Sequence, residues 1–186
     1  MVVSKFACRV IFFGIILAFY PGRSCVWAEE PAVRVAILQD VPGVRVTVMG
    51  PCCLKDLKSQ AVLAKWPALL WQEVRVGRSG VVIGRKEFPS AAVVLEAGPA
   101  GVVRVNAAAY RNSLLLYRSS PEKVTVVNRL PLEEYLVGAL ASEVSPDWPM
   151  EALKTQAVVS RTMVAHRIWI RKKQPFDVTA DVSTHR

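Results

Sequence analysis

The stretch NRLPLEEYLVGALASEVSPDWPMEALKTQAVVSRTMVAHR, residues 128–167, is the longest run with helical patterning in the chain. Pro131 suits a first helical turn, where its missing N–H would have no partner. Glu133 and Glu134 favour the same turn because they complement the helix dipole. The helix is predicted to end near 142–144, since the prolines of the following SPDWP loop push the preceding residues away from the α region.

A second, longer helix is predicted from Pro149 to about Arg171. Asp147 is the predicted cap of this helix, because its carboxylate could accept a free backbone N–H of the first turn. Gln174-Pro175 would break it. Its predicted buried side consists of Met150, Leu153, Ala157, Val158, Val164 and Ala165.

Upstream of residue 128 the apolar residues recur with a period of two, which predicts β-strands. Residues 33–38 and 43–49 are the first two candidates, and about eight strands at a spacing of roughly 8–12 residues favour a meandering antiparallel sheet or a small barrel. Residues 51–72 fit a short helix or strand pieces. Residues 176–182 return to strand character. The predicted fold class is therefore α+β: a β-rich N-terminal half, two helices and a return to strand.

The first 28 residues have the layout of a secretion signal. Basic Lys5 and Arg9 precede an apolar run over 10–20, and Ala28 offers a small residue for cleavage. The run is shorter than the roughly 20 residues that a spanning helix needs. We therefore predict an extracytoplasmic protein, secreted or associated with the cell wall or membrane, whose domain occupies 29–186. Membrane contact is expected only through an uncleaved signal segment.

The charge balance is basic. The chain has 24 Lys and Arg against 15 Asp and Glu, a net charge of +9. Removal of Lys5, Arg9 and Arg23 with the signal leaves 21 against 15, a net charge of +6. Such a surface favours anionic partners such as cell-wall polymers, lipid headgroups or nucleic acid. Export and the lack of a recognised nucleic-acid motif argue against nucleic acid. The alternative is a basic surface that serves only solubility.

The thiols and imidazoles of the chain do not form a metal-binding pattern. Cys52 and Cys53 are adjacent, so a disulfide between them would be strained, and they are predicted to be free thiols or to pair with another chain. His166 is expected on a helix surface, and His185 has no visible co-ligands. No metal and no cofactor is predicted, since no dinucleotide or phosphate-binding fingerprint appears either.

Four segments of the helical region together carry a family resemblance: VNRLPLEEYLVG at 127–138, SEV at 142–144, WPMEALKTQAV at 148–158 and SRT at 160–162. They resemble the signature of the SpoIID/LytB family, the stage II sporulation protein D-like proteins of bacterial cell walls. The similarity covers roughly 100–186 well and the earlier strands loosely. The preceding YRNSL segment resembles the family's YRG-type strand, with Asn112 where glycine is expected.

The resemblance implies a lytic transglycosylase that cleaves peptidoglycan glycan strands, preferably strands stripped of stem peptides. The family's catalytic glutamate falls on Glu143. Gln156 and Arg161 occupy family-matching positions and are candidates to bind substrate, by supporting the groove or the Glu143 loop; a solvated or structural role is the alternative. Trp148 could stack on a sugar ring or pack between the helices. A LytB-like branch of the family is associated with stimulating a partner amidase.

Two departures from the family pattern bear on these expectations. The family domain normally continues beyond residue 186, so part of the fold and of the substrate groove is expected to be missing. Some members bind zinc through cysteines near a Thr-His pair, and here Thr184-His185 has no cysteine near it.

A single carboxyl group suffices for the implied reaction. It protonates the leaving glycosidic oxygen and then accepts a proton from the sugar's own C6 hydroxyl, so the usual spacing of two carboxylates need not hold. Such an acid needs a pKa raised by a partly apolar pocket. Glu143 has Val144 beside it and Trp148 nearby; the alternative is a solvated glutamate at a helix end. The rival functions are a non-catalytic glycan-binding or amidase-stimulating module and an inactive truncated fragment.

Overall fold

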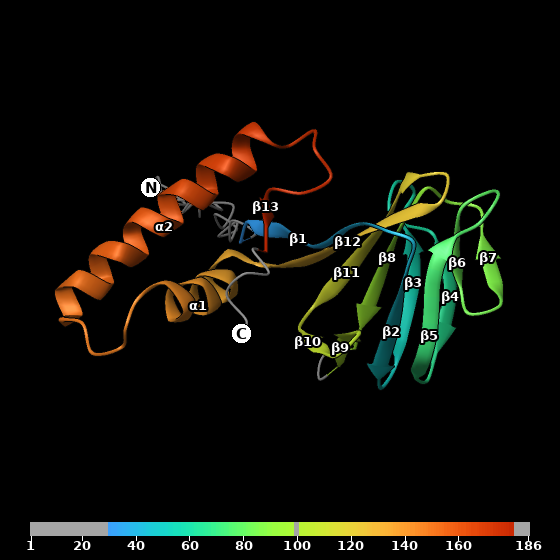
Figure 1. Cartoon of the computed structure of the whole chain (residues 1–186), viewed down its shortest axis with the longest axis horizontal. Coiled ribbons are helices and arrows are strands. Elements are labelled where there is room, and N and C mark those ends of the chain that lie inside the picture. Colours follow the sequence, from blue (N-terminus) through green and yellow to red (C-terminus); the bar gives the residue numbers. More distant parts are fainter. Residues whose placement is uncertain (1–29, 99–100, 181–186) are drawn as a thin grey trace, which may run out of the picture.

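The computed structural model describes residues 30–98 and 101–180, so the predicted signal segment and His185 lie outside the described residues. Within these described residues, twelve strands precede two helices and a short final strand (Figure 1), which confirms the α+β class. The strands are β1 (Ala32–Val41), β2 (Gly43–Met49), β3 (Cys52–Asp56), β4 (Val62–Trp66), β5 (Leu69–Val76), β6 (Val81–Ile83), β7 (Lys86–Phe88), β8 (Ala92–Ala97), β9 (Val102–Val105), β10 (Ala108–Tyr110), β11 (Ser113–Ser120), β12 (Lys123–Pro131) and β13 (Val178–Thr179).

The strands form two sheets that pack face to face. One sheet has the order β13-β1-β12-β11-β8-β3-β4 and the other the order β10-β9-β2-β5-β6-β7. The prediction of a single meander or small barrel is therefore wrong, because β1 pairs with β12 and β3 pairs with β8. Alternation of apolar residues fixes which face of a strand is buried, but it does not fix which strand lies beside it.

The core lies between the two sheets. Leu54, Leu95 and Leu116 of the first sheet and Val46 and Val74 of the second are fully buried in one apolar cluster. Residues 51–72, which fitted either a helix or strands, form β3, β4 and the start of β5. Period-two burial on two facing sheets is the arrangement of a β-sandwich.

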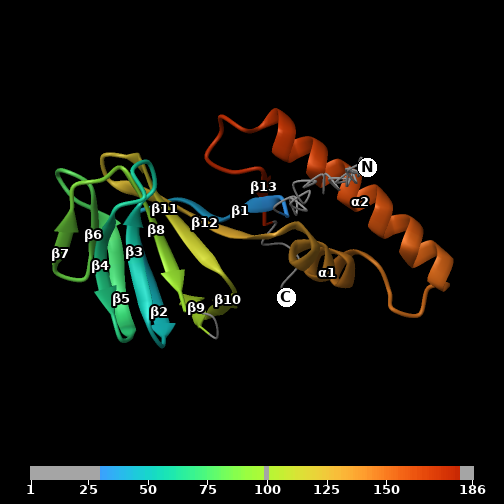
Figure 2. The same cartoon turned by 180° about the vertical axis from the view of Figure 1, so that it is seen from behind.

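Strands β1 and β12 extend beyond the sandwich as a two-stranded ribbon that leads to the helices (Figure 2). Pro131 is the last residue of β12 and the N-cap of α1 (Leu132–Glu143), whose end agrees with the prediction. The backbone N–H of Glu133 donates to a carboxylate oxygen of Glu30 at 3.0 Å. Glu30, far away in sequence, therefore accepts a free N–H of the first helical turn. The Pro131 side chain at the N-cap cannot do this because it has no acceptor atom.

Helix α2 (Met150–Ile170) follows the loop after α1. The predicted cap is wrong: Pro149 occupies the N-cap without a side-chain bond, and Asp147 instead interacts with Ser145. Half of the predicted buried side is also wrong, because Met150, Val158 and Ala165 are exposed. Val164 is buried, and Leu153 and Ala157 are half-buried. In the described ranges no helix is both long and apolar enough to cross a membrane.

The segment after α2 returns to the sandwich ribbon, where β13 pairs in parallel with β1. The fully buried carboxylate of Asp177 accepts bonds from the Arg34 backbone N–H at 2.9 Å, from Nε at 3.1 Å and from Nη2 at 2.6 Å. Arg34 also donates to the backbone carbonyls of Gln174 and Arg171. The Asp177 carboxylate raises the pKa of the Arg34 guanidinium, which therefore stays charged. This clamp fixes the position of Val178 and Thr179.

Two further positions singled out in the sequence can be located in the structure. Asn112 has a φ of 67°, in the left-handed region that asparagine tolerates, and its amide donates to Glu134 of α1 at 2.9 Å. The turn between β10 and β11 thus contacts the first turn of α1. Cys52 and Cys53 are free thiols in the structure, the first buried and the second half-buried.

Candidate active site

A pocket of about 300 Å³ lies between α1, α2 and β13. Glu143, the last residue of α1, is on its wall. The residues that line it are Tyr135, Ala139, Glu143, Gln156, Ser160, Met163, Val164, Arg167, Val178 and Thr179.

Helical spacing explains why these side chains meet. Tyr135, Ala139 and Glu143 follow one another at intervals of four residues, so they share one face of α1. The α2 side chains recur at intervals of three or four, from Gln156 to Arg167, and share the facing side of α2. Thr179 of β13 completes the wall because the Arg34–Asp177 clamp holds that strand beside β1.

Gln156 links the two helices at Glu143. Its amide Nε2 lies 3.4 Å from a carboxylate oxygen of Glu143 and 3.5 Å from Oγ of Ser160. Ser160 is buried, Gln156 is half-buried, and Glu143 is exposed. A carboxylate that is open to solvent on one side and held by an amide on the other can meet a substrate from the open side.

The polar groups of the pocket include one phenol and one guanidinium. Burial raises the pKa of the Tyr135 phenol; the negative charge of Glu143 raises it further, and Arg167 opposes the change. Tyr135 therefore keeps its proton at neutral pH and can act as a hydrogen-bond donor. The pocket offers one carboxylate, one phenolic O–H and one positive charge.

The four residues singled out in the sequence do not all lie together. Glu143 and Gln156 meet in the pocket, whereas Trp148 and Arg161 do not line it. Trp148 lies in the loop between the helices with half of its surface exposed. Arg161 pairs with Glu133 of α1, with Nη2 2.6 Å and Nε 2.8 Å from its carboxylate oxygens. The Glu133 carboxylate raises the pKa of Arg161, and Arg161 lowers the pKa of Glu133. Arg161 thus bridges the two helices at a point outside the pocket.

Sequence reasoning missed Tyr135, Ser160, Arg167 and Thr179 as lining residues. The spacing of Tyr135 and Glu143 could have placed the phenol on the carboxylate's face of α1. Thr179 gave no such signal, because its place depends on the parallel pairing of β13 with β1.

The described part of the chain holds no cluster of three or more His, Cys, Asp or Glu side chains that could bind a metal ion. His166 is exposed on α2 and lies against Trp169, with ring centroids 6.1 Å apart.

Comparisons with known proteins match the helical region and, less closely, the whole chain. Residues 120–186 match the family model described as SpoIID, stage II sporulation protein. An uncharacterised protein of Brachyspira hyodysenteriae is 31% identical over 155 residues, which cover 82% of this chain and 41% of that protein.

The stage II sporulation protein D of Bacillus amyloliquefaciens is 42% identical and that of Bacillus subtilis is 40% identical. Each of these matches covers 52 residues, 28% of this chain and 14% of the relative. No solved structure matches. The matches therefore span less than half the length of these relatives.

Proposed function

Because the chain belongs to the SpoIID family through residues 120–186, we propose that it is a sporulation-related cell-wall protein that cleaves peptidoglycan glycan strands. The reaction is that of a lytic transglycosylase, with Glu143 as general acid and then general base. The observation that carries the proposal is the pocket at the end of α1, where Gln156 contacts the Glu143 carboxylate.

Glu143 would serve both halves of the reaction. Its protonated form gives a proton to the glycosidic oxygen as the bond to C1 breaks. The carboxylate then takes the proton of the C6 hydroxyl while that oxygen closes onto C1, so the product is a 1,6-anhydro sugar and the acid is restored. No water is consumed.

The other pocket residues would position the sugar. Gln156 restrains the Glu143 side chain through its amide, and the protonated Tyr135 can donate to a sugar oxygen. Arg167 can pair with the lactyl carboxylate that a muramic acid residue exposes once its stem peptide is removed. This pairing would explain a preference for stripped strands.

A second candidate function is a non-catalytic glycan-binding module that docks on strands or on a cell-wall amidase. The exposure of Glu143 favours it, because enclosure in an apolar pocket is a common way to raise the pKa of a general acid. Location outside the cytoplasm is likewise a proposal, and it depends on the predicted signal at 1–28.

Product analysis by mass spectrometry separates the two functions. The protein is incubated with glycan strands with and without stem peptides, and anhydro-muramic ends are measured. The proposal expects Glu143→Gln to keep its circular dichroism spectrum and to lose about 100-fold or more in rate. Glu151→Gln is the matched control, since this carboxylate is also exposed but pairs with Lys154 outside the pocket. Equal rates for wild type and Glu143→Gln would refute the catalytic role. Strand binding without anhydro product would favour the module.

A further inference from the structure

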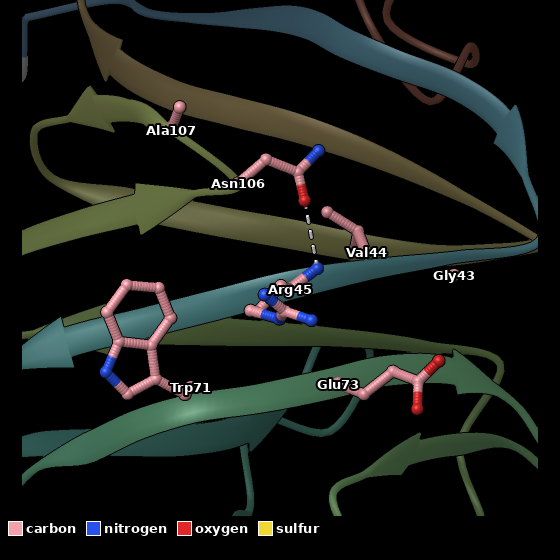
Figure 3. A pocket seen from close by; sticks show the side chains of 7 residues that line it. All are labelled: Gly43, Val44, Arg45, Trp71, Glu73, Asn106 and Ala107. Atoms are coloured by element: carbon pink, nitrogen blue, oxygen red, sulfur yellow. Dashed lines mark hydrogen bonds between the residues drawn. The ribbon is translucent and has the colours of Figure 1, made fainter.

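A larger hollow, of about 830 Å³, lies on the outer face of the β-sandwich rather than among the helices (Figure 3). We call it the Trp71 pocket; its side chains come from β2, from β5 and from the turn between β9 and β10. Those that the argument uses are Arg45, Trp71, Glu73 and Asn106. Neither the family match at 120–186 nor the Glu143 pocket includes any of them.

A β-bulge gives Trp71 its position. The pairing of β2 with β5 shifts between Val46↔Gln72 and Val48↔Leu69, so that Leu70 and Trp71 together oppose Thr47. Trp71 has a φ of 53°, and its backbone N–H donates to Oγ1 of Thr47 at 3.1 Å. Bulges commonly redirect a side chain, and a non-glycine residue keeps a positive φ only where its surroundings enforce it.

The bulge leaves Trp71 67% exposed. A tryptophan buries more apolar surface than any other side chain when it is covered, so its exposure on a rigid strand forgoes a large gain. A flat aromatic ring fixed on a sheet can receive a flat apolar surface such as the face of a sugar ring.

The polar groups around the indole are complementary and free to bind. Arg45 and Glu73 lie opposite each other in the β2–β5 pairing, and in the described ranges neither side chain forms an ion pair. Asn106 uses its Oδ1 to accept the backbone N–H of Arg45 at 3.2 Å, and its amide N–H groups have no partner among the described residues. The pocket thus presents donors and an acceptor whose formal charges cancel.

This combination favours one class of ligand. A nucleic acid or an anionic lipid headgroup would meet the Glu73 carboxylate, and a purely apolar chain would leave the Arg45 guanidinium and the Asn106 amide unpaired. A polyhydroxylated ring satisfies all three, because its hydroxyl groups both donate and accept while its C–H face covers the indole.

We propose that the Trp71 pocket binds a segment of glycan chain, with one sugar ring stacked on Trp71 and its hydroxyl groups bonded to Arg45, Glu73 and Asn106. The choice of the peptidoglycan strand as ligand rests on the proposed function; the sugar-binding chemistry of the pocket does not. The β-sandwich would then bind the glycan strand at a second site, separate from the pocket that contains Glu143.

The test measures dissociation constants by titration calorimetry for stripped glycan strands and for oligomers of N-acetylglucosamine. Glu143→Gln serves as the parent so that the strands stay intact. Added to it, Trp71→Ala is expected to weaken binding about tenfold, as truncation of an aromatic anchor does. Trp71→Phe keeps a ring and should lose less. Trp169→Ala is the matched control, because Trp169 is 66% exposed on α2 and lines neither pocket.

Unchanged affinity in Trp71→Ala, an equal loss in Trp169→Ala, or a parent that binds no glycan would each overturn the proposal. Its failure is distinguishable from failure of the proposed function. Anhydro product from a protein whose binding ignores Trp71 would overturn this inference alone. Trp71-dependent binding by a wild type that makes no anhydro product would overturn only the catalytic role of Glu143.

Discussion

The β-sandwich and the helical pair α1–α2 bury their apolar residues to very different extents. The sandwich encloses fully buried leucines and valines from both sheets, whereas α1 buries only Leu132 and Leu136, and α2 only Ser160 and Val164. Several large apolar side chains of the helices stay exposed: Val137, Met150, Val158, Val159, Met163, Trp169 and Ile170. Stability is therefore concentrated in one region, and the candidate chemistry lies in the other.

The same difference separates the two candidate sites. The Glu143 pocket depends on how two sparsely packed helices and β13 meet, and side chains from all three line it. The Trp71 pocket lies on a sheet whose other face is the core, so its geometry is fixed by the strand pairing itself. Sites on rigid elements hold their geometry more closely than sites whose walls are weakly packed.

The largest expected effect is a loss of folding stability when a leucine of the sandwich is changed to alanine, compared with the same change in the helical pair. Leu116→Ala, at a fully buried position of β11, should lower the free energy of unfolding by about 3 kcal/mol because it leaves a cavity between the sheets. Leu153→Ala on α2, at a half-buried position, should cost about 1 kcal/mol. Denaturant unfolding of both variants gives the comparison. Equal losses would mean that the helical pair is packed as tightly as the sandwich.

A smaller effect is expected at the clamp that joins the regions. Asp177→Ala removes the buried acceptor of Arg34 and should cost about 2 kcal/mol, less than loss of a fully buried ion pair because Arg34 keeps some contact with water. Hydrogen exchange should show faster exchange in β13 and α2 and unchanged exchange in β11. Faster exchange throughout the sandwich would contradict the division into two regions.

The smallest effect is expected for Arg161→Ala. The pair that Arg161 forms with Glu133 is exposed on both sides and screened by water, so its loss should leave the thermal unfolding midpoint almost unchanged. Glu133→Gln should cost about the same, since either change breaks the same contact. If Arg161→Ala also abolished strand binding while Glu133→Gln did not, Arg161 would have the direct substrate contact that its sequence position suggested.

Much of the fold was predictable from local sequence alone. The end of α1, the extent of α2 and the first two strands follow from proline positions and from the apolar period, which act over a few residues. The buried face of α2 was not predictable. Met150 and Val158 stay exposed although the pattern marks them as core, because burial depends on which other elements pack against the helix.

The candidate site divides in the same way. Glu143 and Gln156 were identified in the sequence, and the structure brings them together. Arg161 and Trp148 also lie in the segments that resemble the family signature, yet neither lines the pocket. A family-matching position marks a residue as part of the pattern but does not say toward which neighbour its side chain turns.

The α+β class, the two helices and the candidate acid Glu143 could be read from local sequence, because helix and strand patterns and residue identities are local properties. The pairing of β1 with β12, the position of β13 beside the pocket through Asp177, and the exposure of Trp71 at a bulge became known only from the folded chain. These features arise from contacts between residues far apart in the chain. Their energies depend on which surfaces meet, and no local pattern records that.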